Sequence, residues 1–206
     1  MHYLVNHPLL AHKLGILRDK NTRNKEFREL ASEITMLLTY EAMKDVRTRE
    51  VTVETPLEQA TCLHVNENIV VVPILRAGVG MLEAMLKLLP EARIGFVGIY
   101  RDHDTSLPVT YFEKLPVSTP DAHAVIVDPM LATGGSLIKA IELLKEKGYR
   151  RIKIISILSS PEGIKTVSEA HPDVDIYTGC IDRCLNERNY ILPGLGDAGN
   201  RLFGTE

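Results

Sequence analysis

Charged and hydroxyl side chains follow the apolar runs of this sequence, at the points where each run ends. Arg76 follows the run 69–75, and Asp128 follows the run 124–127. The residues that follow two further runs are Arg101, Asp102, Ser159 and Ser160. In open parallel sheets ligands bind outside the carboxyl ends of the strands, so we expect these side chains on one rim. Cations, carboxylates and hydroxyls on one rim are suited to a phosphorylated sugar.

The most informative motif is AVIVDPMLATGGSLIKAIELL, which predicts a buried strand ending at Asp128, a loop of small residues, and a helix that begins near Ser136. A helix N-terminus presents unpaired N–H groups and a partial positive charge, and Gly134 and Gly135 let the backbone approach an anion closely. Thr133 and Ser136 add hydroxyl donors. The loop therefore predicts a monophosphate cradle, the alternative being a tight turn with a helix cap.

Asp128, the acid before this loop, narrows the class of ligand that the loop is expected to bind. A carboxylate beside a phosphate cradle repels phosphate, so Asp128 is expected to accept hydrogen bonds from the hydroxyls of a ribose. A triphosphate loop of the Walker type requires GK[ST], whereas here Gly135 is followed directly by Ser136.

Composition excludes several classes of protein. Among 206 residues, 45% are hydrophobic and 25% charged, which is typical of a soluble globular protein. The net charge is -3 and no long basic run is present, so nucleic acid is a poor candidate partner. No apolar stretch approaches the roughly 18 residues of a membrane span, and the start MHYLVNHPLLAHKL does not resemble a signal peptide. We therefore expect a cytoplasmic protein that does not bind membranes.

Cysteine and histidine give no metal site. The three cysteines, Cys62, Cys180 and Cys184, make no disulfide framework, and structural zinc at Cys180 and Cys184 lacks a second ligand pair. The histidines form no helical pair at metal-binding spacing. His103 is kept as a candidate because it lies in the polar segment RDHDTSLPVTYFEKLPVSTPD, which is expected to be a mobile flap.

The elements that must position these residues follow from periodicity. Apolar residues spaced three and four apart predict helices over 9–17 and 27–42, and Pro161 starts another that ends before His171. From residue 69 short apolar runs alternate with helical stripes, and the runs are 69–75, 94–100, 124–127, 152–158 and 174–177. This order predicts an α/β fold, a parallel twisted sheet with N-terminal helices and a flap, forming a single domain over 1–206. Runs without alternation indicate strands buried on both faces, with helices on each side.

Three motifs carry a family resemblance. The strand, acid and TGGS loop resemble the 5-phosphoribosyl 1-diphosphate site of the type I phosphoribosyltransferases. Within that superfamily, VVPILRAGVGM, VDPMLATGGS and YILPGLGDAGNRLFGT resemble the uracil phosphoribosyltransferases, and the similarity runs through almost the whole chain. The resemblance implies transfer of the phosphoribosyl group to N1 of uracil, giving UMP and diphosphate.

The resemblance also implies roles for individual residues. It assigns the ribose 5-phosphate part to Asp128, Pro129, Met130, Leu131, Ala132, Thr133, Gly134, Gly135 and Ser136. It assigns the diphosphate to Arg76 and Arg101, and it makes Arg76, Asp128 and Asp197 the catalytic residues, with Asp197 reaching toward the sugar. The uracil pocket would be formed by Ile191, Gly196, Asp197 and Ala198, where glycine-rich backbone can pair with the alternating C=O and N–H groups of the base. Mg²⁺ would be held through diphosphate and water, without a direct protein ligand.

Two positions depart from the family pattern, and alternatives stay open. Asn200 stands where an acid is usual, and Ser160 stands where alanine is usual.

The base that receives the phosphoribosyl group could be a purine or orotate instead of uracil. Orotate carries a carboxylate that needs a cation in the base pocket, and Arg201 is the only nearby candidate. A regulator that senses the sugar diphosphate and binds nucleic acid is the alternative from another class. The resemblance further implies a homodimer or homotetramer and admits GTP as an effector.

Overall fold

A central sheet of eight strands organises the chain in the computed structural model, which describes residues 1–101 and 108–205 and only the backbone of Arg101. The strand order is β1-β12-β10-β8-β4-β6-β7, and β5 also pairs with β4. The bounds are β1 His2–Leu4, β4 Asn68–Leu75, β5 Arg93–Ile94, β6 Phe96–Arg101, β7 Pro108–Lys114, β8 Ala122–Val127, β10 Arg151–Ser156 and β12 Asp175–Thr178. Every pairing is parallel except that of β6 with β7, which is antiparallel. The predicted parallel sheet is confirmed, with the antiparallel edge strand β7 as an addition that the sequence did not predict.

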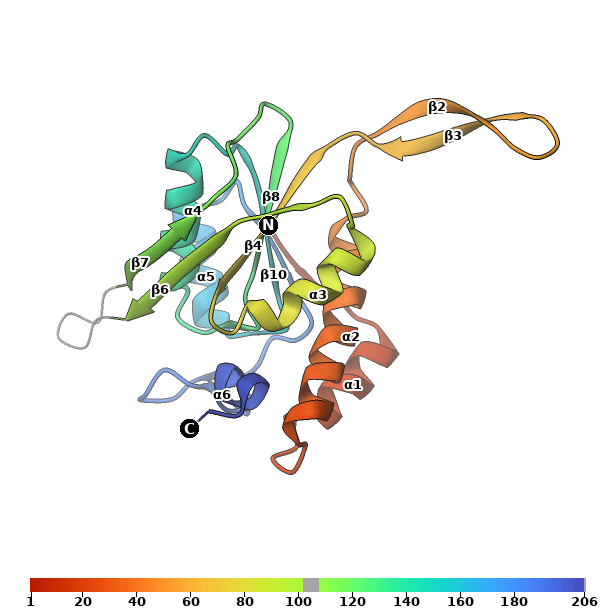
Figure 1. Ribbon diagram of the computed structural model, residues 1–206. Coiled ribbons are helices and arrows are strands. Elements are labelled where there is room, and N and C mark those ends of the chain that lie inside the picture. Colours follow the sequence, from red (N-terminus) through yellow and green to blue (C-terminus); the bar gives the residue numbers. More distant parts are fainter. Residues whose placement is uncertain (102–107, 206) are drawn as a thin grey trace.

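Helices cover both faces of this sheet (Figure 1). One face packs against α1 (Pro8–Arg18), α2 (Asn24–Ala42) and α3 (Val79–Leu88), and the other against α4 (Gly135–Glu146) and α5 (Pro161–Ala170). The short helix α6 (Ala198–Phe203) joins the first core through α2. Successive residues of β4 divide between the two cores: Val71 belongs to the first, and Val70 and Val72 belong to the second. Side chains alternate across a strand, so an uninterrupted apolar run is what burial on both faces requires.

Two predicted runs are each divided in the structure. The run 94–100 is interrupted at Gly95, where β5 ends and β6 begins. The run 152–158 is divided between β10 and β11 (Leu158–Ser159), and β11 pairs with β9 (Met130–Leu131) outside the main sheet. This small pairing joins the loop after β8 to the segment after β10.

An antiparallel hairpin of β2 (Thr48–Glu54) and β3 (Gln59–Val65) projects from the body of the protein (Figure 1). We call it the arm. Its turn is held by Thr55, whose hydroxyl oxygen accepts from the backbone N–H of Leu57 at 3.2 Å and of Glu58 at 3.1 Å. The apolar runs did not predict the arm, because most of its residues are exposed and no strand of it is continuously apolar.

The expected flap needs correction in its described part. Residues 108–114 form strand β7, which pairs with β6 and extends the sheet at its edge. Its exposure alternates at first, as expected for a strand with one face against the protein. Asp102 and His103 lie outside the described residues.

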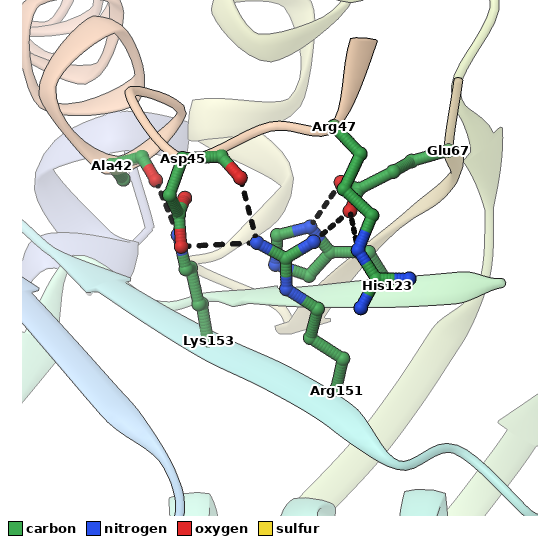
Figure 2. A network of polar contacts seen from close by, with 7 residues as sticks. All are labelled: Ala42, Asp45, Arg47, Glu67, His123, Arg151 and Lys153. Atoms are coloured by element: carbon green, nitrogen blue, oxygen red, sulfur yellow. Dashed lines mark hydrogen bonds and ion pairs between the residues drawn. The ribbon is translucent and has the colours of Figure 1, made fainter. Parts of the chain in front are cut away.

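A polar network joins helix α2, the base of the arm and the amino ends of two strands (Figure 2). Its members are Ala42, Asp45, Arg47, Glu67, His123, Arg151 and Lys153. The buried Lys153 ammonium donates to the Ala42 carbonyl at the end of α2 at 2.7 Å and pairs with Asp45. A cation at a helix C-terminus is favourable, since the last carbonyls carry partial negative charge. The buried Glu67 contacts Arg47, Arg151 and His123, so its charge is balanced by neighbouring cations.

Candidate functional site

Arg76 and Asp128 lie at the carboxyl ends of neighbouring strands. β4 and β8 pair in parallel with Pro73 opposite Val127, so Arg76 and Asp128 follow directly on the same rim. β6, which ends at Arg101, lies on the other side of β4. The rim expected from the sequence is thus present in the backbone, at the end of the sheet opposite the network of Figure 2. The Arg101 side chain lies outside what the structure describes.

The loop after β8 encloses a hollow of about 110 Å³. It is lined by Asp128, Met130, Leu131, Ala132, Thr133, Gly134, Ser136 and Leu137. Pro129 in this loop and Gly135 at the start of α4 are not among the lining residues. The Pro129 carbonyl accepts from the N–H of Leu158 at 3.0 Å, and this bond holds the loop against the segment after β10.

Helix α4 begins at this hollow with a glycine as its N-cap. Gly134 has φ +87, and a Cβ built on it would lie 2.9 Å from a side-chain carbon of Val167. Both facts require glycine here. Without a side chain, Gly134 cannot cap the first N–H groups of the helix, whereas Ser160 caps α5 by accepting from Gly163 N–H at 2.9 Å. The start of α4 is therefore suited to an external anion.

Asp128 is a partly buried carboxylate with one hydrogen bond to its Oδ1, from the Met130 N–H at 3.2 Å. Burial raises the pKa of Asp128 to about 7, and the hydrogen bond from Met130 opposes the shift only in part. The ionised carboxylate is therefore destabilised in the fold, and a positive charge close to it would stabilise it.

Arg76 reaches from the rim to the last helix. Its Nη2 lies 3.4 Å from Asn200 Oδ1, and its Nη1 lies 3.4 Å from Thr205 Oγ1. Asp197 is the N-cap of α6, since its Oδ1 accepts from the Asn200 N–H at 2.8 Å. A Cβ on Gly199 would lie 3.3 Å from Asp197 Oδ1 and 3.9 Å from Arg76 Nη2, so the acid and the cation both border this glycine.

The residues expected to bind uracil lie in one short segment. Ile191 is buried in β14 (Ile191–Leu192), which pairs with β13 (Cys184–Leu185). Gly196 has φ +84, and Ala198 starts α6. Residues 194–197 of the GLGDAG motif form the loop, and Ala198 and Gly199 begin helix α6, which starts where Asp197 supplies a cap.

Sequence reasoning missed Arg18, which holds this segment from the end of α1. Its Nη1 and Nη2 donate to the two carboxylate oxygens of Asp182 at 2.8 and 2.6 Å, and Nη1 also donates to the Gly194 carbonyl at 2.7 Å. Burial works to raise the pKa of Asp182, but hydrogen bonds from Arg18 and Gly194 outweigh it and lower the pKa. No motif marks Arg18, because its partners lie more than 160 residues away.

Arg201 holds the same segment from the other side. Its Nη1 donates to the Leu195 carbonyl at 2.8 Å, and its Nη2 donates to the Asp19 carbonyl at 2.6 Å. The guanidinium also lies over the Phe27 ring, with 4.4 Å between its carbon and the ring centroid.

Ser159 and Ser160 do not line the hollow, although the sequence placed them on the rim. Both are buried: the Ser159 hydroxyl donates to Thr178 at 2.8 Å, and the Ser160 hydroxyl donates to the Ala132 carbonyl at 2.6 Å. Ser160 thus ties helix α5 to the loop after β8.

Comparison with known proteins decides the family. The sequence model described as "Uracil phosphoribosyltransferase" matches residues 4–205. The chain belongs to the uracil phosphoribosyltransferase family. A relative of that name from Symbiobacterium thermophilum is 52% identical over 204 residues, covering 98% of each chain. Another, from Clostridium botulinum strain Eklund 17B, is 54% identical over 203 residues, covering 98% of this chain and 97% of its own.

Solved structures show the same fold. AQ2163 protein from Aquifex aeolicus superposes with a TM-score of 0.94 at 38% identity, covering 98% of both chains. A hypoxanthine-guanine phosphoribosyltransferase from Bacillus anthracis superposes with a TM-score of 0.53 at 15% identity over 77% of this chain and 80% of its own, and shows the fold alone. The predicted family, fold class and enzyme class are confirmed.

The family resemblance implies Mg²⁺, and the residues near the hollow fit an ion that is held together with the substrate. Among residues 1–101 and 108–205, no group of three or more His, Cys, Asp and Glu side chains could hold a metal ion. Asp128 offers one carboxylate with a raised pKa. This donor set fits a cation that arrives bound to substrate oxygens and water. In the described part of the chain, no helix has the length and apolar character needed to cross a bilayer.

Proposed function

We propose that this enzyme transfers the 5-phosphoribosyl group of 5-phosphoribosyl 1-diphosphate to N1 of uracil, giving UMP and diphosphate. The observation that carries the proposal is the start of α4, where the N-cap Gly134 supplies no side-chain cap, beside the Asp128 carboxylate, whose pKa burial raises to about 7. The helix start suits the 5-phosphate, and Asp128 suits the ribose hydroxyls that lie next to it. The full-length match to the family supports this assignment.

The transfer exchanges one bond at C1 of the sugar. The C1–O bond to diphosphate breaks and its electron pair leaves with the diphosphate, while a bond from uracil N1 to C1 forms as the N1 proton is lost. Positive charge develops at the sugar ring when the old bond breaks early. Asp128 and Asp197 stabilise that charge, and Arg76 with Arg101 stabilises the leaving diphosphate. Positioning and electrostatics suffice, so no nucleophilic side chain is assigned.

Mg²⁺, when bound through diphosphate oxygens and water, supplies further positive charge to the leaving group. In this chain the residues that act beside it are Arg76 and Asp128. Asp128 responds to that charge because its own pKa is raised to about 7, so a nearby cation favours its ionised form.

Uracil is the base that the C-terminal segment suits best. Its edge alternates C=O and N–H groups, which main-chain groups of the segment 191–198 can match. Orotate would bring a carboxylate that needs a cation. Arg201, the candidate for that role, is committed to the Leu195 and Asp19 carbonyls and to the Phe27 ring. This commitment argues against orotate.

A base panel tests the proposal. Pure protein is mixed with labelled sugar diphosphate, Mg²⁺ and, in turn, uracil, orotate, hypoxanthine and adenine. We expect UMP from uracil alone, and product from another base instead would reject the assignment. The regulator alternative predicts a gel shift with nucleic acid and no UMP. Asp128→Asn serves as the control that retains the fold and loses use of the sugar diphosphate.

The exposed arm suggests how subunits of this protein assemble. We propose a homodimer or homotetramer of single-domain subunits, because the arm exposes apolar side chains that a partner could cover, Leu57 at 95%, Leu63 at 67% and Val65 at 53%. Sedimentation equilibrium measures the mass directly. GTP as an effector and a cytoplasmic location stay predictions.

A further inference from the structure

We propose that Arg18 and Asp182 are positioning residues that fix the shape of the base-binding segment through Gly194. The inference rests on the proposed function. Gly194 lies between Ile191 and Gly196, two of the expected uracil contacts, and both of its backbone groups are held. Its N–H donates to Asp182 Oδ2 at 2.8 Å, and its carbonyl accepts from Arg18 Nη1 at 2.7 Å.

The ion pair of Arg18 with Asp182, which together hold Gly194 and which we call the clamp, is well formed and shielded from water. The Asp182 side chain is 4% exposed and the Arg18 side chain 22%. Two parallel charge-assisted hydrogen bonds fix the relative orientation of both planar groups. Since a buried charge is costly when its partner is removed, the two side chains hold each other in place. Cys180 Sγ also accepts from Arg18 at 3.2 Å and completes the surroundings of the guanidinium.

Holding Gly194 also holds Ile191. Gly194 has φ +65, and a Cβ built on it would lie 2.1 Å from the Ile191 carbonyl oxygen. The chain thus folds back closely on itself, and no other residue fits there. Because the Ile191 carbonyl lies so close to the side of Gly194 where a side chain would stand, we expect a displacement of Gly194 to disturb Ile191 as well.

The clamp also limits the freedom of the residues that follow. Arg201 holds the next carbonyl, that of Leu195, at 2.8 Å. Two consecutive carbonyls are therefore fixed by two arginines from helices at opposite ends of the chain, and Gly196 and Asp197 come directly after them. Recognition by main-chain groups depends on such fixed orientation, because a loose segment must be ordered by the ligand at the expense of affinity.

The kinetics of Arg18→Lys test the inference. Lysine retains the charge, but a single ammonium cannot replace the fork that bridges both Asp182 oxygens and the Gly194 carbonyl. We expect the KM for uracil to rise by roughly 10- to 100-fold, the loss that a displacement of about 1 Å causes. The KM for the sugar diphosphate should rise much less than that for uracil. Asp182→Asn should act in the same direction.

Lys13→Gln is the matched control. Lys13 lies on the same helix as Arg18 and forms an ion pair with Glu33 at 2.6 Å, away from the C-terminal segment. It should leave both KM values unchanged. Hydrogen exchange followed by mass spectrometry should show faster exchange over 191–197 in Arg18→Lys and not in Lys13→Gln.

Each outcome is decisive. An unchanged KM for uracil in Arg18→Lys, or an equal rise in KM for both substrates, would overturn the positioning role. If Asp182→Asn does not fold, Arg18→Lys alone decides. If the wild-type protein makes UMP and the variants have wild-type kinetics, the positioning role of the clamp is rejected and the proposed function stands. Wild-type protein that makes no UMP rejects both.

Discussion

The Arg76 guanidinium lies 3.4 Å from the amide oxygen of Asn200, so the last helix holds the cation that follows the central strand β4. Asn200 itself is fixed through its N–H, which donates to Asp197. At this position, where the family resemblance implies an acid, the chain has a neutral amide. The amide orients Arg76 without neutralising its charge, which stays available to an anionic substrate.

Arg76→Ala should lower turnover by roughly 10²- to 10³-fold, the effect of losing one preorganised charge contact in the transition state. Steady-state rates of UMP formation measure it. Arg150→Ala is the control, because Arg150 is exposed at the opposite end of the sheet. Kinetics of Arg76→Ala equal to those of the wild type would remove Arg76 from the scheme.

Asp128→Asn should weaken use of the sugar diphosphate and also change the pH dependence of stability. In the unfolded chain the carboxyl loses its proton near pH 3.8, but in the fold its pKa is about 7. Between these values the folded state binds more protons, so wild-type stability falls as the pH rises. Compared with the wild type, Asp128→Asn should raise the free energy of unfolding by up to about 3 kcal/mol at pH 8 and leave it unchanged at pH 3. The figure allows for the partial exposure of the side chain.

Urea denaturation of wild type and Asp128→Asn at pH 4, 6 and 8 measures this difference. Glu58→Gln, an exposed acid in the turn of the arm, is the control and should show no such trend. A constant difference across the pH range would contradict the shifted pKa of Asp128.

His123 should give a pH dependence of the opposite sign. Burial lowers its pKa from 6.5 to about 4, and the nearby charge of Lys153 acts in the same direction. As the pH falls through 6.5 only the unfolded histidine takes up a proton, so stability falls until about pH 4 is reached. The full loss is on the order of 3 kcal/mol.

His123→Gln removes this titration while keeping an N–H group that can donate to Glu67. The free energy of unfolding, measured from pH 7 down to pH 4, should decline less steeply than in the wild type. Parallel curves for the two proteins would show that His123 is already charged in the fold.

Removal of divalent cations should stop the reaction without loosening the fold. EDTA should abolish UMP formation, and added Mg²⁺ should restore it, because the metal is expected to arrive with the diphosphate. The thermal midpoint should not change with EDTA, since the described residues contain no cluster of metal ligands. A lower midpoint in EDTA would indicate a structural ion.

The sequence predicted the parts of the fold that local patterns determine. The strand β4 and the helix α2 follow from a continuous apolar run and from a stripe at helical spacing, and both extend the predicted ranges by only a few residues. The arm was missed because its strands have little apolar surface to bury. Helix α6 was missed because its six residues include a glycine and follow a glycine-rich loop.

The site was predictable where its residues are consecutive and not where they meet through the fold. The loop from Asp128 to Ser136 forms one motif, so its hollow could be inferred from spacing alone. The clamp of Arg18 and Asp182 could not, because each is an ordinary charged residue until the topology brings the end of α1 against the C-terminal segment. The same holds for Arg201, which looked available to a substrate and is bound to carbonyls.

The position of β1 has a consequence for how the chain is assembled. His2–Leu4 pairs in parallel with residues 176–178 at the edge of the sheet. During synthesis from the amino end, its hydrogen-bonding partner emerges only after nearly all of the chain. Residues 2–4 therefore cannot pair until residues 176–178 have been made, so closing this edge of the sheet must await that later part of the chain.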